Sequence, residues 1–171
     1  MLPARGAVDG QDEVDRIVAA WGRERPDLDP RPLHVFSRIS RLSRRLDLAR
    51  RRVFIDHELE GWEFDVMSAL RRAGEPYQLT AGRLLNETLV SSGTMTNRID
   101  RMVAHGLVVR AVGTTDRRVV LVRLTPLGKR KVDAAMADLL ESEHELLGEL
   151  EPAEAELLSS LLRRLLLPLD R

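Results

Sequence analysis

The sequence predicts a mainly α fold of the α+β type, in which several helices accompany one short β-hairpin. Apolar residues recur at three- and four-residue spacing over most of the 171 residues, which is the pattern of amphipathic helices. Only two segments, 107–112 and 118–124, are β-branched with a period of two, and GTTDR separates them, as expected for a hairpin. The chain contains no cysteine, which excludes disulfides, thiolate nucleophiles and cysteine-ligated metals.

Three helices are expected in the first half of the chain. The first covers 11–22 and carries an apolar stripe that ends at Trp21. A proline-rich stretch follows, and Pro32 suits the first turn of a second helix that runs to about residue 56. A third helix covers about 61–73, and Gly74 is a plausible stop.

Two short helices come next and are followed at once by the hairpin. Thr80 can cap a helix over 81–89, and a helix beginning at one of the serines 91–92 ends at Gly106 in the left-handed conformation. Two helices joined by a tight turn and followed by a hairpin describe a winged helix-turn-helix, whose second helix enters the major groove of DNA.

The residue types of that second helix fit a groove-reading role. Met95, Ile99 and Met102, with Val103, form a stripe that holds the helix to the domain. The polar residues left to face DNA are Ser91, Ser92, Thr94, Thr96, Asn97 and Arg101. At the hairpin tip, Arg117 and Arg118 can enter a minor groove, with Asp116 orienting one guanidinium. The alternative is a small helix–hairpin domain that binds nothing.

Two further helices, about 126–150 and 152–167, complete the chain. The last helix is rich in leucine and is apolar on more than one face. A helix that buries a single stripe does not need this much apolar surface. A two-fold interface would bury the excess, although the central helix of a monomer would also do so. We therefore expect dimerisation through the C-terminal segment 126–171, which follows a DNA-binding domain at 57–125.

The distribution of charge agrees with a polyanion as the partner. The net charge is zero, but residues 31–131 carry 20 Lys/Arg against 10 Asp/Glu, a balance of +10. The corresponding balance is −3 for residues 1–30 and −7 for residues 132–171. A basic middle between acidic ends indicates a surface that binds nucleic acid. The simpler alternative is that the charges only cover solvent-exposed helix faces.

The stretch LTAGRLLNETLVSSGTMTNRIDRMVAHGLVVR, with the wing DRRVVLVRLTPLG, resembles the MarR family of transcription regulators. The D-R-R and L-T-x-x-G motifs of the wing are typical of that family, and the flanking helices also fit. The resemblance implies a homodimer that is held together by dimerisation helices at 1–56 and 126–171 and binds a pseudo-palindromic operator in double-stranded DNA.

A narrower resemblance concerns the urate-responsive PecS/HucR-like branch, which has an extra first helix. That branch implies a small-molecule effector, urate or a related purine, bound by Trp21, Asp65, Arg98 and Arg110. An indole can pack on a planar anion, a guanidinium can pair with its anionic edge, and a carboxylate can accept a ring N–H. Each residue also has a structural alternative. Trp21 could be an apolar anchor of the first helix, and Asp65 could form a salt bridge with Arg98. Arg98 could instead contact a DNA phosphate, and Arg110 could be a solvated strand residue.

The remaining observations exclude other classes. No catalytic motif or metal-ligand spacing appears, so we expect neither an enzyme nor a cofactor. The N-terminus has no signal-peptide pattern and no apolar run approaches the roughly 20 residues of a membrane span, so we expect a cytoplasmic protein without membrane contact. Two alternatives stay open: a different aromatic or carboxylate effector, or a ligand-independent protein-interaction module.

Overall fold

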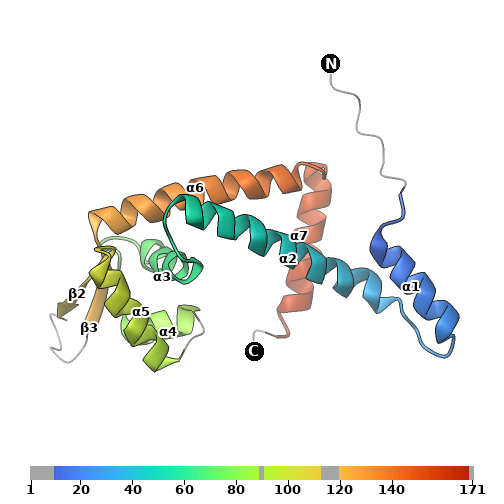
Figure 1. Cartoon of the computed structure of the whole chain (residues 1–171), viewed down its shortest axis with the longest axis horizontal. Helices are drawn as coiled ribbons and strands as arrows, with labels where there is room; N and C mark the ends of the chain where they lie inside the picture. Colours follow the sequence, from blue (N-terminus) through green and yellow to red (C-terminus); the bar gives the residue numbers. More distant parts are fainter. Residues whose placement is uncertain (1–9, 89–90, 113–119, 170–171) are drawn as a thin grey trace, which may run out of the picture. The chain divides into compact units, whose positions relative to one another are not determined.

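The computed structural model describes residues 10–88, 91–112 and 120–169 (Figure 1). The chain divides into two compact units, residues 1–48 and 49–171. The long helix α2 (Pro32–Asp56) begins in the first unit and ends in the second. As predicted, its first residue is a proline, which needs no hydrogen-bond partner for the missing N–H.

The first unit joins α1 (Glu13–Glu24) to the start of α2 largely through charges. Asp12 caps α1, and Arg38 of α2 donates to Asp12 and to Asp15 with nitrogen–oxygen distances of 2.8 Å. Arg41 pairs with Glu13 at 2.7 Å. The hydrogen bond from Arg38, helped by the backbone N–H of Asp15, lowers the pKa of Asp12 to about 2.

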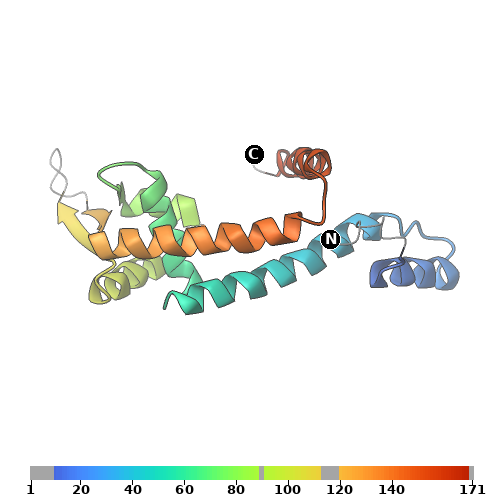
Figure 2. The same ribbon diagram turned by 90° about the horizontal axis from the view of Figure 1, so that it is seen from above.

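The second unit is organised around α3 (Gly61–Arg72), whose Val66, Met67 and Leu70 are fully buried. The helices α4 (Ala81–Thr88) and α5 (Ser92–Ala104) and the N-terminal half of α6 (Pro126–Leu147) gather around it (Figure 2). The buried residues of α6 end at Leu139. The apolar core therefore lies where the helix-turn-helix meets α3 and α6.

A three-stranded antiparallel sheet lies at the end of this core, with the strand order β1-β3-β2. The hairpin consists of β2 (Val108–Val112) and β3 (Val120–Leu124), which confirms the predicted pair of strands. The third strand, β1 (Gln78–Thr80), was not predicted because three residues are too few to show an alternating pattern. It is a strand because Leu79 pairs with Val122 across the chain.

A tight joint connects the sheet to α6. The Thr125 hydroxyl caps α6 by accepting from the N–H of Gly128 at 3.0 Å, and it donates to the carbonyl oxygen of Gly106 at 2.7 Å. A side chain at Gly128 would put its Cβ 2.1 Å from the carbonyl oxygen of Leu107. The L-T-x-x-G motif is thus explained by close packing of α6 on the segment that leads into β2.

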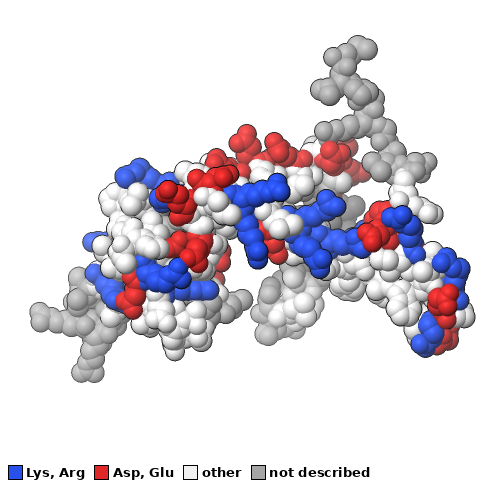
Figure 3. All heavy atoms as spheres, viewed as in Figure 1, with Lys and Arg blue, Asp and Glu red and all other residues white. Residues whose placement is uncertain are grey.

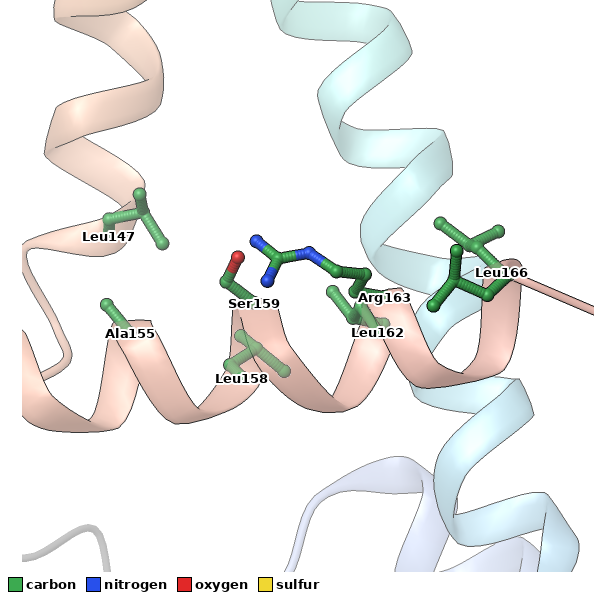
Figure 4. A pocket seen from close by; sticks show the side chains of 8 residues that line it. Leu147, Ala155, Leu158, Ser159, Leu162, Arg163 and Leu166 are labelled. Carbon is green, nitrogen blue, oxygen red and sulfur yellow. The ribbon is translucent and has the colours of Figure 1, made fainter. Parts of the chain in front are cut away.

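The last helix, α7 (Pro152–Leu166), begins where predicted, whereas α6 ends at Leu147, a few residues before the predicted end near residue 150. No described residue of α7 is buried. Five of its leucines are exposed by 37% to 60%: Leu157, Leu158, Leu161, Leu165 and Leu166. Leu147 of α6 and one face of α7 line an apolar hollow of about 490 Å³, beside which lies the guanidinium of Arg163 (Figure 4).

The winged helix-turn-helix prediction is confirmed in its element order and, within a few residues, in its boundaries. Gly74 and Gly106 have positive φ angles of 78° and 68° at the ends of α3 and α5, as a left-handed stop requires. In the described part of the chain, no helix is long and apolar enough to cross a membrane.

Candidate nucleic-acid interface and effector site

The helix α5 presents a polar face and buries an apolar one. Met95, Ile99 and Met102 are buried, as predicted, and pack in the core of the second unit. Val103, which was predicted to join that stripe, is instead 39% exposed, because it lies one position beyond the face that contacts the core. The six polar residues predicted to face DNA are all exposed: Ser91, Ser92, Thr94, Thr96, Asn97 and Arg101.

The N-terminus of α5 suits a phosphate oxygen. Ser91 is the N-cap residue, but its hydroxyl bonds to that of Thr94 at 2.9 Å and makes no side-chain cap to the backbone. Thr96 donates to the carbonyl oxygen of Ser92 at 3.1 Å. The first N–H groups of α5 therefore lack a side-chain cap, and such groups at a helix N-terminus can bind an anion.

The N-terminus of α3 holds two arginines of α5 through Trp62. The guanidinium carbons of Arg98 and Arg101 lie 5.4 Å and 4.9 Å from the centre of the Trp62 ring, within the range of cation–π attraction. Glu60 accepts from the Trp62 indole N–H and pairs with Arg101, and these contacts hold the pKa of Glu60 below its ordinary value. Arg101 is therefore shared between α3 and any DNA that α5 meets.

A second contact holds the other end of α5. Glu63 is 2% exposed and accepts from the backbone N–H of Glu60 at 3.0 Å. Its second oxygen lies 2.9 Å from Nδ1 of His105, the C-cap residue of α5. Sequence reasoning missed Glu60, Trp62 and Glu63 as positioning residues. The available signal was the glutamate pair at three-residue spacing, which forms a capping box.

The wing is described only at its base. Val112 and Val120 face each other at the end of the paired strands. Asp116, Arg117 and Arg118, which were predicted to reach DNA, lie outside the described residues. Their predicted roles stay predictions.

The four residues predicted to hold an effector fall into different surroundings. Asp65 is exposed to solvent, yet partial burial of its carboxyl raises its pKa. The positive charges of Arg98, Arg50 and Arg72 lower this pKa and offset part of the rise. Arg98 thus lies within electrostatic range of Asp65. Trp21 belongs to the first unit, where it is 49% exposed and lines a shallow hollow on α1.

Arg110, which the branch resemblance implies as an effector residue, has an acidic neighbour of its own on α5. Its guanidinium lies 2.6 Å from the carboxylate of Asp100 on α5. The ion pair forms because β2 follows directly on α5, which brings the strand back beside the outer face of the helix. Of the two predicted arginines, only Arg98 is brought toward Asp65.

Basic side chains also gather outside the helix-turn-helix. The surface over α2 shows a band of arginine side chains (Figure 3). The exposed arginines of this helix are Arg41, Arg44, Arg45, Arg50, Arg51 and Arg52. Among the described residues, no group of three or more His, Asp or Glu side chains could hold a metal ion.

The chain is similar to several known regulators. The sequence profile described as "MarR family" matches residues 57–119. The HTH-type transcriptional regulator PecS of Dickeya dadantii is 35% identical over 152 residues, which cover 89% of this chain and 92% of PecS.

Two solved structures extend the comparison. BpsR of Bordetella bronchiseptica, studied for the regulation of its DNA binding by 6-hydroxynicotinic acid, has a TM-score of 0.62 and 29% identity, covering 77% of this chain and 91% of BpsR. A mutant MarR from E. coli complexed with operator DNA has a TM-score of 0.64 and 24% identity, covering 91% of this chain and 99% of that one. At that identity, the likeness to the E. coli protein concerns the fold alone.

Proposed function

Because the chain belongs to the MarR family of DNA-binding transcription regulators, we propose that it is a cytoplasmic homodimeric repressor that releases its operator on binding urate or a related purine. It is a regulator and not an enzyme. The observation that carries the proposal is α5, a helix with a polar outer face, held to the core by Met95, Ile99 and Met102.

The proposed DNA contacts follow from the residue types on α5 and the wing. The N-terminus of α5, with Ser91 and Ser92, takes a phosphate, and Asn97 and Arg101 read base edges in the major groove. Thr94 and Thr96 add short polar contacts. Arg117 and Arg118 enter the adjacent minor groove, oriented by Asp116.

The proposed homodimer rests on unburied apolar surface. Leu157, Leu161 and Leu165 on α7 are 44% to 60% exposed, and a helix with this much apolar surface is typical of an interface. A two-fold dimer presents two copies of α5 to operator half-sites about 34–36 Å apart. Removing residues 152–171 should give aggregated or monomeric protein without operator binding. A soluble, tight dimer after truncation would place the interface elsewhere.

The proposed effector is an anion because Asp65, one of the four residues that the branch implies, lies within electrostatic range of several arginines. Asp65 accepts a ring N–H, while Arg98 and the branch residue Arg110 offer guanidinium groups to an anionic edge. Trp21 is the fourth residue that the branch implies. An effector that binds Asp65 on α3 and also attracts Arg98 on α5 would have a different affinity for the free and the DNA-bound conformation, which is what release requires.

The second candidate effector is a small aromatic carboxylate. It is favoured by the similarity to BpsR, whose DNA binding is regulated by 6-hydroxynicotinic acid. A thiol-based oxidant signal is excluded because the chain has no cysteine. A ligand-independent interaction module would use α7 for another protein and would show no salt-dependent binding to DNA.

The test is a gel shift of the full chain on the DNA upstream of its own coding sequence. Urate, xanthine, hypoxanthine and 6-hydroxynicotinic acid are each titrated into the complex. A coupling of about 1–3 kcal/mol weakens operator binding about 5- to 150-fold. Release by urate or another purine supports the proposal. Release by 6-hydroxynicotinic acid alone favours the second candidate, and binding that ignores all four compounds contradicts both.

A further inference from the structure

A cavity beside Asp65 contains a buried hydroxyl group with no hydrogen-bond partner. The cavity measures about 340 Å³ and is lined by α3, α4 and α6. Ser68 on α3 is 4% exposed and lines it. Its Oγ is the buried side-chain oxygen that has no hydrogen-bond partner in the described part of the chain. A buried polar group left unpaired is costly, and a ligand that bonds to it recovers the loss.

The rest of the lining combines apolar walls with charge. Phe64 is buried and Met136 is partly buried, and both contact the cavity. Asp65 and Arg72 lie on the same face of α3 as Ser68, at three- and four-residue spacing from it. Apolar walls with a few convergent polar groups are typical of small-molecule sites, whose volumes run from about 300 to 1,000 Å³. At this size the cavity fits one planar ring system.

We propose that this cavity seats the ring of the effector, which is a planar, anionic heteroaromatic molecule bearing ring N–H and C=O groups. Ser68 and Asp65 hydrogen-bond to those groups, and Phe64 and Met136 contact the ring. Arg72 adds a second guanidinium on the Asp65 side of the site, besides that of Arg98. The inference rests on the proposed function, because it locates the effector of that regulator. It adds Ser68 and Arg72, which neither the motifs nor the resemblance identified.

The position of the cavity also provides a route to the DNA-binding helix. Arg72 on α3 lies 3.4 Å from Glu87 on α4, the first helix of the helix-turn-helix. An anion that takes Arg72 displaces Glu87 and so removes one link between α3 and α4. Because α4 packs directly against α5, the loss changes the support of the helix that meets DNA.

The experiment is isothermal titration of urate and of 6-hydroxynicotinic acid into the full-length protein and four variants. Ser68→Ala should weaken binding about 5- to 10-fold and leave the melting temperature unchanged or raised, because it deletes an unpaired hydroxyl. Arg72→Gln should weaken binding about 10-fold or more. Glu87→Gln should strengthen it several-fold by freeing Arg72. Ser142→Ala on α6, the same substitution at a residue outside the cavity, should leave binding unchanged.

The opposite signs at positions 72 and 87 separate a ligand role from a structural one. If the ion pair only supported the fold, both substitutions would change binding in the same direction. If the parent protein binds a probe but Ser68→Ala and Arg72→Gln bind it as tightly, the cavity is not the site and the proposed function stands. If the parent binds neither probe, the effector part of the proposed function fails and this inference fails with it.

Discussion

The guanidinium of Arg110 on β2 forms an ion pair with the carboxylate of Asp100 on α5, with 2.6 Å between nitrogen and oxygen. The pair connects the first strand of the hairpin to α5. Both side chains are about half exposed, so the pair contributes at most about 1 kcal/mol to stability. Its main effect is to hold β2 beside α5, the two elements that carry the proposed DNA contacts.

Asp100→Asn and Arg110→Gln should each weaken operator binding about two- to five-fold, an estimate that corresponds to a pair energy of up to about 1 kcal/mol. The double variant should be no weaker than either single one, because all three lack the same pair. Gel shifts at fixed salt measure this. The proposed role of Arg110 in the effector site adds a second expected result, in which urate affinity rises in Asp100→Asn and falls in Arg110→Gln.

The second prediction concerns Glu60, which binds Arg101 in the free protein. DNA must compete with this carboxylate for the guanidinium. Glu60→Gln should therefore tighten operator binding about 3- to 10-fold in gel shifts at fixed salt, because the freed guanidinium of Arg101 is then available to a base edge.

The control for Glu60 is the same substitution in an Arg101→Ala background. There the gain should disappear, because the carboxylate no longer has a guanidinium to release. A gain that persists without Arg101 would mean that Glu60 repels DNA directly.

The third prediction concerns the wing arginines. Replacing Arg117 and Arg118 by alanine should weaken DNA binding and reduce the salt slope by about one per lost contact. Asn97→Ala should instead lower the preference for the operator over random DNA. Equal affinity of the wing double variant and the parent at every salt concentration would show that the wing does not contact DNA.

Local signals predicted most of the fold because the helix ends depend on neighbouring residues. Pro32, Thr80, Gly106 and Thr125 each act within one turn of their own position, so the chain around them is enough. The strand β1 escaped prediction because its pairing with β3 spans about forty positions, from Leu79 to Val122.

The site was less predictable, since it depends on which side chains meet. The polar face of α5 followed from helical periodicity, and its exposure could be read from the sequence. The contact of the Trp62 ring with Arg98 and Arg101 could not, because α3 and α5 are brought together only by tertiary packing. The unpaired hydroxyl of Ser68 is likewise a property of its surroundings.

The fourth prediction concerns pH and the first unit. The pKa of Asp12 is lowered to about 2 from 3.8 by Arg38. A carboxyl whose folded pKa is depressed contributes stability above its unfolded pKa, and the contribution is lost as the pH falls through the folded value. The attachment of α1 to α2 should thus be intact above about pH 4 and weaken toward pH 2.

Fluorescence of Trp21 in a Trp62→Phe background should report this loss as an acid transition. Asp12→Asn should remove most of it, because the amide cannot titrate. A high-salt titration at neutral pH should also weaken the attachment, since the pairs at Arg38 and Arg41 lie at the surface. An acid transition of unchanged size in Asp12→Asn would assign it to another carboxyl.

The last prediction concerns the joint between the sheet and α6. Gly128→Ala would place a Cβ 2.1 Å from the carbonyl oxygen of Leu107, and backbone atoms cannot yield as a flexible side chain can. Moving α6 away would also break the bonds from Thr125 to the segment before β2. We expect the free energy of unfolding to fall by about 3 kcal/mol or more, in the range of severe core overpacking.

Gly22→Ala on α1 is the matched control, because nothing lies within 4 Å of its added methyl group, and a helical glycine-to-alanine change stabilises by about 0.5–1 kcal/mol. Thermal melting followed by circular dichroism compares the two, and a Gly128→Ala protein that melts with the parent would mean that α6 packs less closely on Leu107 than the structure has it.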